Sequence, residues 1–256
     1  MRTFLTALLF IAIIGCAAQG RSSEVEIGLL TQAKPTKIII TPLRGDYSVV
    51  SNDSVIYSLK NHDLLHISLK DQKLELKTLN GLLGTFLNVR LIPQGEDGAF
   101  KLKSVIPYGH AKSYDDILNI NNGSKWLQVI NEVNIDKYVA GVVKSEVGTN
   151  EGLELYKVHA IICRTYALSN FRKHEEEDYQ LCDKVQCQAC AGSCDQADPV
   201  TELTYAASND ILKAAVQTAG LVLVDTTLEL ITASFHSNCG GQTCNSEDVW
   251  MLSKIY

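Results

Sequence analysis

This 256-residue sequence has no run of basic residues, no internal repeat and no apolar segment long enough to cross a bilayer comfortably. Acidic residues outnumber basic ones by 29 to 23, and the formal net charge of −6 is spread along the chain. Nothing in it would follow a phosphate backbone, so we do not expect a nucleic acid partner. The hydrophobic content of 46% is enough for a substantial core in one or two domains.

The longest apolar run stands at the N-terminus and is typical of an export signal. Arg2 precedes the segment FLTALLFIAIIG, which is shorter than the roughly 20 residues that a transmembrane helix needs. The run ends at IIGC, which resembles a bacterial lipobox with Cys16 as the lipidated residue; ordinary cleavage near residues 17–20 is the alternative. We therefore expect residues 1–20 to be a signal peptide and the mature protein to be exported to the cell envelope. Lipid on Cys16 would anchor it to the membrane.

Residues 21–110 have the pattern of a β-rich region. Runs such as KIIITPL at 37–43 and LLHISLK at 64–70 alternate or stay apolar for several residues, and turn residues separate them. Residues 107–124 are polar and rich in glycine and asparagine, which predicts a loop or a domain seam. Residues 126–133 predict a further strand. The β-rich region holds no cluster of titratable groups, so we expect it to be structural or to position a substrate.

The segment NIDKYVAGVVKSEVG, from Asn134 to Gly148, has the start and stop signals of a helix. Asn134 can cap the first turn, and Gly148 suits the left-handed residue beyond the last turn. At about 100° per residue, Glu146 falls about 20° from Ile135, inside the apolar arc of the helix. Two interpretations stay open. The carboxylate is paired or used in chemistry, or the last turn frays and Glu146 points to solvent.

A second helix is predicted from Asn150 to about Lys173, apolar on nearly all sides and therefore buried. Arg164 lies about 20° from Leu153 on one apolar face. A buried guanidinium keeps its proton and needs an anion or carbonyl oxygens around it. Arg164 is thus a candidate partner for Glu146 or for a substrate oxygen. The alternative is a side chain that snorkels to the surface along its own stem.

The last part of the chain combines cysteines, one more helix and a glycine-rich loop. Cysteines gather at four positions: Cys182, Cys187, Cys190 and Cys194. Ser208 predicts the cap of a helix over residues 209–219, and LVLVD and LELITASFH predict strands. The final loop, SNCGGQTCNSEDVW, brings backbone amides and Glu247 into a small volume, as ligand-contacting loops do.

Four motifs in this order resemble a known family: SEVG, CRTYAL eighteen residues later, LCDKVQCQA, and FHSNCGGQTCNSEDVW. They are similar to the SpoIID/LytB domain, the stage II sporulation protein D family, from about residue 126 to the end. The expected fold is α+β, with a β-rich N-terminal part followed by a helix-containing SpoIID-type catalytic core over residues 111–256. Chains of this family usually continue past the EDVW motif, so we expect a domain truncated at its C-terminus.

The resemblance implies a murein-associated protein. Sporulation members of the family are lytic transglycosylases that cut glycan strands lacking stem peptides, and other members are described as enhancers of cell-wall amidases. The implied function is therefore non-hydrolytic cleavage of peptidoglycan glycan strands in cell-wall remodelling. The alternative is a non-catalytic murein-binding enhancer, with a cell-wall amidase as its partner.

The resemblance also implies roles for individual residues. The family's catalytic acid matches Glu146, and the arginine of its ARTYAL-type motif matches Arg164. Its HSSSGG-type loop, which binds substrate, matches His236, Ser237, Gly240 and Gly241. Glu247, nearby in the same loop, is a further candidate for binding substrate.

The implied chemistry requires no cofactor, but some family members carry a structural zinc on two cysteines and two histidines. Cys182 and Cys187 match the two thiols, and Gln186 stands where a histidine often precedes the second cysteine. His174 is the candidate third ligand, with Cys190 or Cys194 as a fourth. A disulfide knot within the cysteine cluster is the alternative to zinc.

Overall fold

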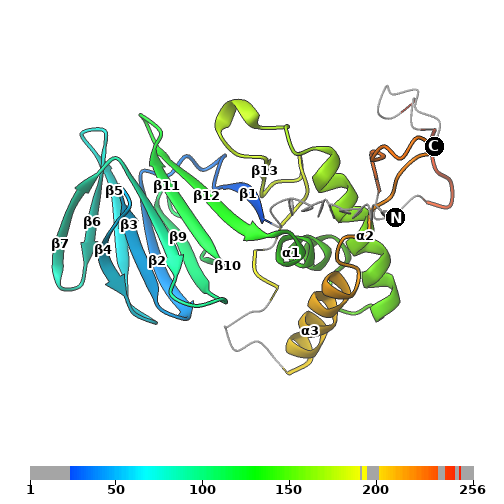
Figure 1. Cartoon of the computed structure of the whole chain (residues 1–256), viewed down its shortest axis with the longest axis horizontal. Helices are drawn as coiled ribbons and strands as arrows, with labels where there is room; N and C mark the ends of the chain where they lie inside the picture. Colours follow the sequence, from blue (N-terminus) through cyan, green and yellow to red (C-terminus); the bar gives the residue numbers. More distant parts are fainter. Residues whose placement is uncertain (1–23, 191, 195–201, 236–239, 246–247, 249–256) are drawn as a thin grey trace, which may run out of the picture.

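The computed structural model describes residues 24–190, 192–194, 202–235, 240–245 and 248, with only the backbone of 202–207. Its fold is α+β: two β-sheets pack face to face, and three helices lie at one end of this sandwich (Figure 1). Residues 1–20, with the expected signal peptide and Cys16, lie outside the described residues. Within the described part, no helix is long and apolar enough to span a membrane.

The strands of each sheet follow an order that differs from their order in the sequence. In the described residues the first sheet runs β13 (Leu181–Cys182), β1 (Glu24–Leu29), β12 (Leu127–Asn134), β11 (Ile117–Asn122), β8 (Asn88–Pro93), β3 (Tyr47–Ser51) and β4 (Ser54–Leu59). The second runs β10 (Lys112–Asp115), β9 (Ala99–Ile106), β2 (Lys37–Arg44), β5 (Leu65–Lys70), β6 (Lys73–Thr78) and β7 (Gly81–Phe86).

Alternation along the strands explains why the two sheets pack together. Ile38 and Ile40 of β2, and Leu65 and Ile67 of β5, are fully buried, while their strand neighbours are only partly covered. Successive side chains of a strand point to opposite faces, so this period places one face of each strand in the core. The expectation of a β-rich region is confirmed.

The loop predicted at residues 107–124 is wrong, because this stretch contains all of β10 and all of β11. Its asparagines lie on the partly exposed face of β11, where Asn119 accepts a hydrogen bond from Arg90 and Asn121 donates one to Gln128. Leu118 and Ile120 alternate with them and are buried. The expected domain boundary near residue 110 falls between β9 and β10, which pair with each other.

The first strand, β1, lies between two strands that come much later in the chain. β1 pairs antiparallel with β12 on one side and parallel with β13 on the other. Residues from before and after position 110 therefore complete one sheet, and β12 leads directly into the helical layer (Figure 1).

The helix expected over Asn134–Gly148 is confirmed as α1 (Ile135–Val147). The Asn134 side-chain oxygen accepts a hydrogen bond from the Asp136 amide at 2.9 Å, and Gly148 has φ of 86°. α2 (Leu153–Ser169) is shorter at both ends than predicted, and a 3-10 turn, η1 (Glu175–Glu177), follows it.

Two expectations for the last part of the chain are wrong. α3 (Glu202–Gln217) begins before Ser208, so Ser208 lies inside the helix instead of capping it. The segments LVLVD and LELITASFH form only an isolated bridge between Val224 and Leu230 among the described residues. Leu223, Val224 and Leu228 are 38%, 44% and 80% exposed, so these three side chains add little apolar burial that would support a strand.

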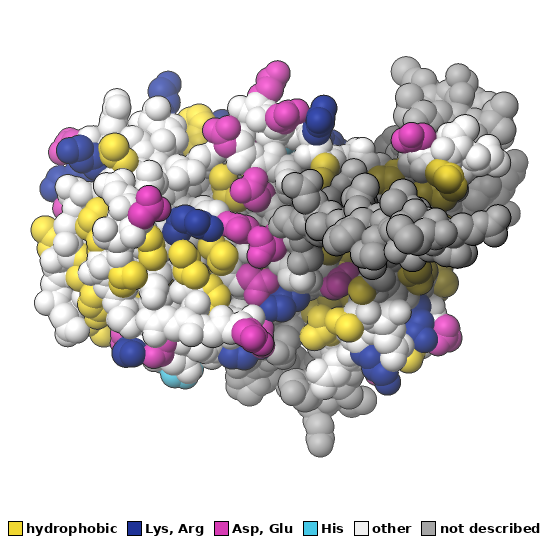
Figure 2. Space-filling model, viewed as in Figure 1, with side chains coloured by type: hydrophobic (Ala, Val, Ile, Leu, Met, Phe, Trp, Pro, Cys, Tyr) yellow, Lys and Arg dark blue, Asp and Glu magenta, His cyan; other side chains and the backbone are white. Residues whose placement is uncertain are grey.

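Figure 2 shows how charged and hydrophobic side chains are distributed over one face of the molecule. Acidic side chains gather near the middle of this view, whereas hydrophobic side chains gather over the sandwich.

Candidate functional site

Glu146 lies in the last turn of α1 and is half-buried. Its Oε1 atom accepts a hydrogen bond of 3.0 Å from the backbone amide of Ala189. The last turn is closed, because the Gly148 amide donates to the Lys144 carbonyl at 3.2 Å. The carboxylate is thus held against the segment after β13 and does not extend from a frayed helix end.

His159 of α2 is a titratable neighbour of Glu146. Burial lowers the pKa of His159 below its usual value, and the nearby Glu146 carboxylate opposes this shift. Within the described residues the buried Nδ1 atom of His159 has no hydrogen-bond partner. Its ring meets the ring of Phe235 edge to face, with centroids 5.8 Å apart. Phe235 directly precedes the glycine-rich loop, so His159 links Glu146 to the start of that loop.

Sequence reasoning did not find His159. It stands in the apolar run KVHAII, where a histidine carries no motif of its own. Its place beside Glu146 depends on the packing of α1 against α2, which the sequence period alone does not give.

Cys163 lies one turn after His159 and is fully buried. Burial, reinforced by Glu146, raises the pKa of the Cys163 thiol to about 12. The thiol is therefore protonated at neutral pH, which does not suit a nucleophile. Its backbone carbonyl instead accepts a hydrogen bond of 3.3 Å from the Gln188 side chain.

Arg164 is only 1% exposed, so the snorkelling interpretation is wrong. Its Nε and Nη2 atoms donate to Asp136 Oδ1 at 3.2 and 2.7 Å. The remaining donors reach carbonyls at and beyond the end of α3, those of Ala215, Thr218 and Leu221, at 2.8, 2.8 and 3.3 Å.

Arg164 thereby supplies the last carbonyls of α3 with donors that the helix itself lacks, and joins them to the first turn of α1. Its carboxylate partner among the described residues is Asp136 and not Glu146. The two residues that the family motifs single out therefore have separate surroundings.

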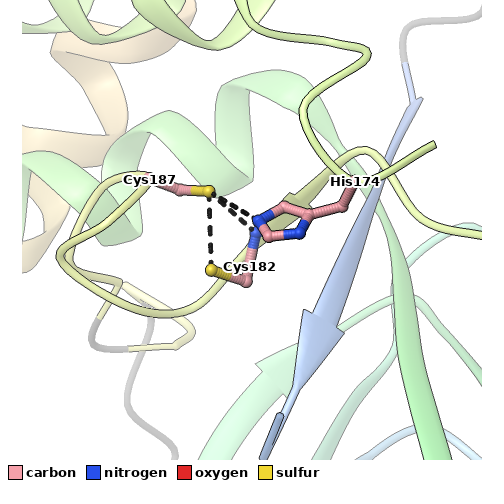
Figure 3. Close-up of side chains that lie close together, drawn as sticks. All are labelled: His174, Cys182 and Cys187. Carbon is pink, nitrogen blue, oxygen red and sulfur yellow. Dashed lines mark hydrogen bonds between the residues drawn. The ribbon is translucent and has the colours of Figure 1, made fainter. Parts of the chain in front are cut away.

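His174, Cys182 and Cys187 converge after α2, as the sequence analysis expected (Figure 3). The Cys187 sulfur is 3.3 Å from His174 Nε2 and 3.4 Å from the Cys182 sulfur. All three donor atoms lie within 4.8 Å of one another. Both thiols are free and buried, so this pair is not a disulfide.

Neither of the proposed fourth ligands lies in this cluster. Cys190 packs against α1, where a Cβ added to Gly141 would be 3.2 Å from its sulfur. The Cys194 thiol donates to the Ser208 carbonyl at 3.4 Å. The fourth-ligand expectation is therefore wrong for both, because the chain carries each sulfur onto a helix instead.

The Cys182 and Cys187 thiols share one hydrogen bond, which shifts their pKa values in opposite directions. This bond is the largest cause that lowers the pKa of Cys182, to about 5, and it raises the pKa of Cys187. The Gln186 side chain adds a contact of 3.3 Å to the Cys182 sulfur. Two sulfurs and an imidazole nitrogen are donors that zinc prefers, and a four-coordinate site would need one more ligand.

The segment after Cys187 connects this cluster to Glu146. Gln188 is 3% exposed, accepts a hydrogen bond from the Tyr138 hydroxyl at 3.4 Å and donates to the Cys163 carbonyl. The next residue, Ala189, supplies the amide that binds Glu146. Only one residue, Gln188, therefore separates a cysteine of the cluster from the residue whose amide holds the candidate catalytic carboxylate.

Residues 123–224 match the family model of SpoIID, described as Stage II sporulation protein. The chain contains a SpoIID domain. No curated protein matches the chain significantly. The domain gives the protein a cell-wall-related role.

The SpoIID match contains Glu146, Arg164 and the cysteine cluster, but it ends before the glycine-rich loop. Of the loop residues expected to bind substrate, Gly240 and Gly241 are described, both exposed and with φ of 62° and 94°. Such left-handed backbone favours glycine. The other three expected residues, His236, Ser237 and Glu247, lie outside the described residues.

Proposed function

We propose that the SpoIID domain cleaves peptidoglycan glycan strands without hydrolysis, with Glu146 as both acid and base. The observation that carries this proposal is the setting of Glu146, half-buried between α1, α2 and the Gln188–Ala189 segment. One oxygen is fixed by the Ala189 amide. In the described residues the other oxygen makes no hydrogen bond, and it can carry the proton.

The proposed reaction moves one proton out and one back. Glu146 protonates the glycosidic oxygen as the bond from this oxygen to the sugar C1 breaks. The resulting carboxylate then accepts the proton of the C6 hydroxyl, whose oxygen forms a new bond to C1. The product ends in a 1,6-anhydro sugar and no water is consumed. One carboxyl does both jobs, unlike the paired carboxylates of hydrolytic glycosidases.

Glycan strands lacking stem peptides are the proposed substrate, and the envelope is the proposed location. The export signal and the lipid on Cys16 remain proposals from the sequence. Metabolic labelling with a palmitate analogue tests the anchor, and an unlabelled mature protein would contradict it.

A second candidate function is a murein-binding enhancer of a cell-wall amidase. The bond from Ala189 favours it, because a glutamate that only secures the Gln188–Ala189 segment would make the same contact. In that case Glu146 holds the fold and Arg164 holds the helices, and neither acts on a bond.

Mass spectrometry of peptide-free glycan digests separates the two functions. The parent chain should release products ending in 1,6-anhydro-muramic acid. Glu146→Gln keeps the acceptor for the Ala189 amide but loses the titratable proton, so release should fall roughly 10²–10⁴-fold while the fold survives. Release at the parent rate by Glu146→Gln would refute the assignment. A parent chain that releases none but stimulates an amidase would establish the enhancer.

We also propose a structural zinc on His174, Cys182 and Cys187. Bound there, the ion would supply a crosslink between His174 just before η1, strand β13 and the turn after this strand. The chain's own contribution is to hold Cys187 two residues from Ala189. The cleavage step itself uses no metal.

A further inference from the structure

A cavity of about 510 Å³ lies between three segments at the sandwich, and Glu146 does not line it. These segments are residues 30–34 after β1, residues 123–126 between β11 and β12, and residues 176–179, which begin within η1 and continue beyond it. The volume is within the range of roughly 300–1,000 Å³ that ligand pockets occupy.

Two aromatic side chains, Trp126 and Tyr179, form apolar walls of this cavity. The Tyr179 ring stacks on His174 with centroids 5.0 Å apart. It also lies against Gly28, where an added Cβ would meet the ring at 2.6 Å. Tyr179 is therefore fixed in place by its neighbours. Trp126 is half-buried, and Lys34 covers its ring with Nζ 4.5 Å from the centroid.

One polar group in the cavity wall lacks a partner. The Thr31 hydroxyl oxygen is buried and makes no hydrogen bond to any described residue. Buried polar groups are nearly always hydrogen-bonded, so an unpaired one that lines a cavity indicates a ligand or an ordered water. The amide side chains of Asn122 and Gln128 are already engaged, by the Gln72 carbonyl and the Glu177 carbonyl respectively.

The charged side chains that line the cavity indicate which class of ligand it can bind. Glu176, Glu177 and Asp178 oppose the single cation Lys34, so an anion would be repelled. Glu176 and Asp178 are exposed, where solvent and salt screen any attraction for a cation. The uncharged part of the lining includes the buried Thr31 hydroxyl and the side chains of Trp126 and Tyr179. Sugar rings combine apolar C–H faces with hydroxyl edges and match this arrangement.

We propose that this cavity is a second saccharide site, separate from Glu146, and that it binds a neutral N-acetylhexosamine oligosaccharide. The choice of ligand class rests on the proposed function. A run of contacts leads from Tyr179 through His174 and Cys187 to the segment that holds Glu146. A long strand seated here would be kept on the molecule while another part of it is cleaved.

The test is a titration of the full chain with tetra-N-acetylchitotetraose. Trp126 is one of two tryptophans in the sequence, so in a Trp250→Phe background its fluorescence reports directly on the cavity. We expect saturable binding that changes this signal. Trp126→Ala, followed by calorimetry, should weaken the affinity about tenfold through loss of stacking. Thr31→Val keeps the side-chain shape and should weaken it about fivefold.

Tyr108→Ala is the matched control, because Tyr108 is 74% exposed and carries Lys103 over its ring at 5.0 Å without lining the cavity. It should bind like the parent. Glu146→Gln should also bind like the parent, whether or not the chain cleaves glycan. This separates the saccharide site from the proposed activity.

Three results would overturn the proposal. The first is parent-like affinity in both Trp126→Ala and Thr31→Val, and the second is a loss of affinity confined to Glu146→Gln. Tighter binding of the de-N-acetylated, cationic tetramer than of the neutral one would show that the acidic rim selects the ligand instead.

Discussion

Arg164 and Glu146 both stand on apolar helix faces, but their surroundings assign them different tasks. The Arg164 guanidinium donates hydrogen bonds to Asp136 and to backbone carbonyls at and beyond the end of α3. Glu146 keeps one oxygen unused in the described residues. A guanidinium committed to protein oxygens holds structure, whereas a half-buried carboxyl with one oxygen to spare can transfer a proton.

Arg164→Lys should therefore reduce stability more than it reduces the activity of the folded fraction. Lysine keeps the charge but cannot reach Asp136 and the α3 carbonyls from one nitrogen, so about 2–4 kcal/mol should be lost in urea unfolding. Arg172→Lys is the control, since Arg172 is exposed and should change stability by less than about 0.5 kcal/mol. Parent stability with abolished cleavage would instead place Arg164 on the substrate.

His159 gives the protein a predictable response to acid. Its pKa is lowered in the folded state, chiefly by burial, so folding favours the neutral ring. This contribution is complete above the unfolded-state pKa of about 6.5 and is lost as pH falls through the folded-state value. His159→Gln should lose less thermal stability than the parent between pH 7 and pH 5. His110→Gln is the control, because His110 is exposed, and its melting temperature should depend on pH as that of the parent does. If the melting temperature of His159→Gln also falls with pH as in the parent, the expectation is contradicted.

The residues of the site differ in how far sequence reveals them. The position of Glu146 inside an apolar arc follows from the local helical period, which a single segment carries. Its donor Ala189 lies 43 residues further on, and the contact depends on where the cysteine-rich segment crosses α1. His159 is hidden for the same reason, because helix packing and not spacing brings it to Glu146.

At the scale of elements, α1 and the segment over residues 187–194 form one unit. An added Cβ on Gly141 would meet the Gly192 carbonyl oxygen at 2.3 Å and the Cys190 sulfur at 3.2 Å. The close approach is possible because residue 141 has no side chain. The segment that presents Ala189 to Glu146 is therefore seated directly on α1.

Gly141→Ala should separate this segment from α1. We expect a loss of about 1–3 kcal/mol in unfolding free energy, since the contact involves backbone that cannot rotate away. The rate of glycan cleavage should also fall, because the Ala189 amide would move away from the Glu146 carboxylate. Gly152→Ala is the matched control, as an added Cβ there meets nothing within 4 Å. Equal stability of the two variants would show that the segment is not seated as described.

The elements also differ in what sequence could predict. α1 could be predicted from the Asn134 cap and from the helical period of its apolar residues, and the structure confirms both. β10 and β11 were hidden because polar residues fill their outer faces, where only cross-strand partners such as Arg90 and Gln128 explain them. Ser208 resembled a cap in sequence, yet α3 starts earlier and its side chain is buried.

At the scale of the whole molecule, the SpoIID match does not delimit a separate sheet. β1 precedes residues 123–224 by a long stretch of sequence, yet it is paired between β12 and β13, which both belong to the match. The sandwich thus supplies a strand to the sheet from which α1 emerges. Chain order could not reveal this pairing, because its partners lie about a hundred residues or more from β1.

The cluster of His174, Cys182 and Cys187 should determine how firmly this assembly is held. If it binds zinc, the purified protein should contain about one metal per chain, and a chelator should lower its melting temperature. Cys187→Ser should lose the metal. Cys190→Ser should keep it, because Cys190 is equally a buried thiol but packs on Gly141. The readout is elemental analysis together with thermal unfolding.

The same experiment tests whether the cluster supports Glu146. Cys187 lies two residues before Ala189, so removing the ion should loosen the amide that fixes the Glu146 oxygen. Chelated protein should then cleave glycan more slowly while remaining folded, and added zinc should restore the rate. Protein that is metal-free as purified and insensitive to a chelator would mean that the two buried thiols and the imidazole stabilise the segment by their own hydrogen bonds.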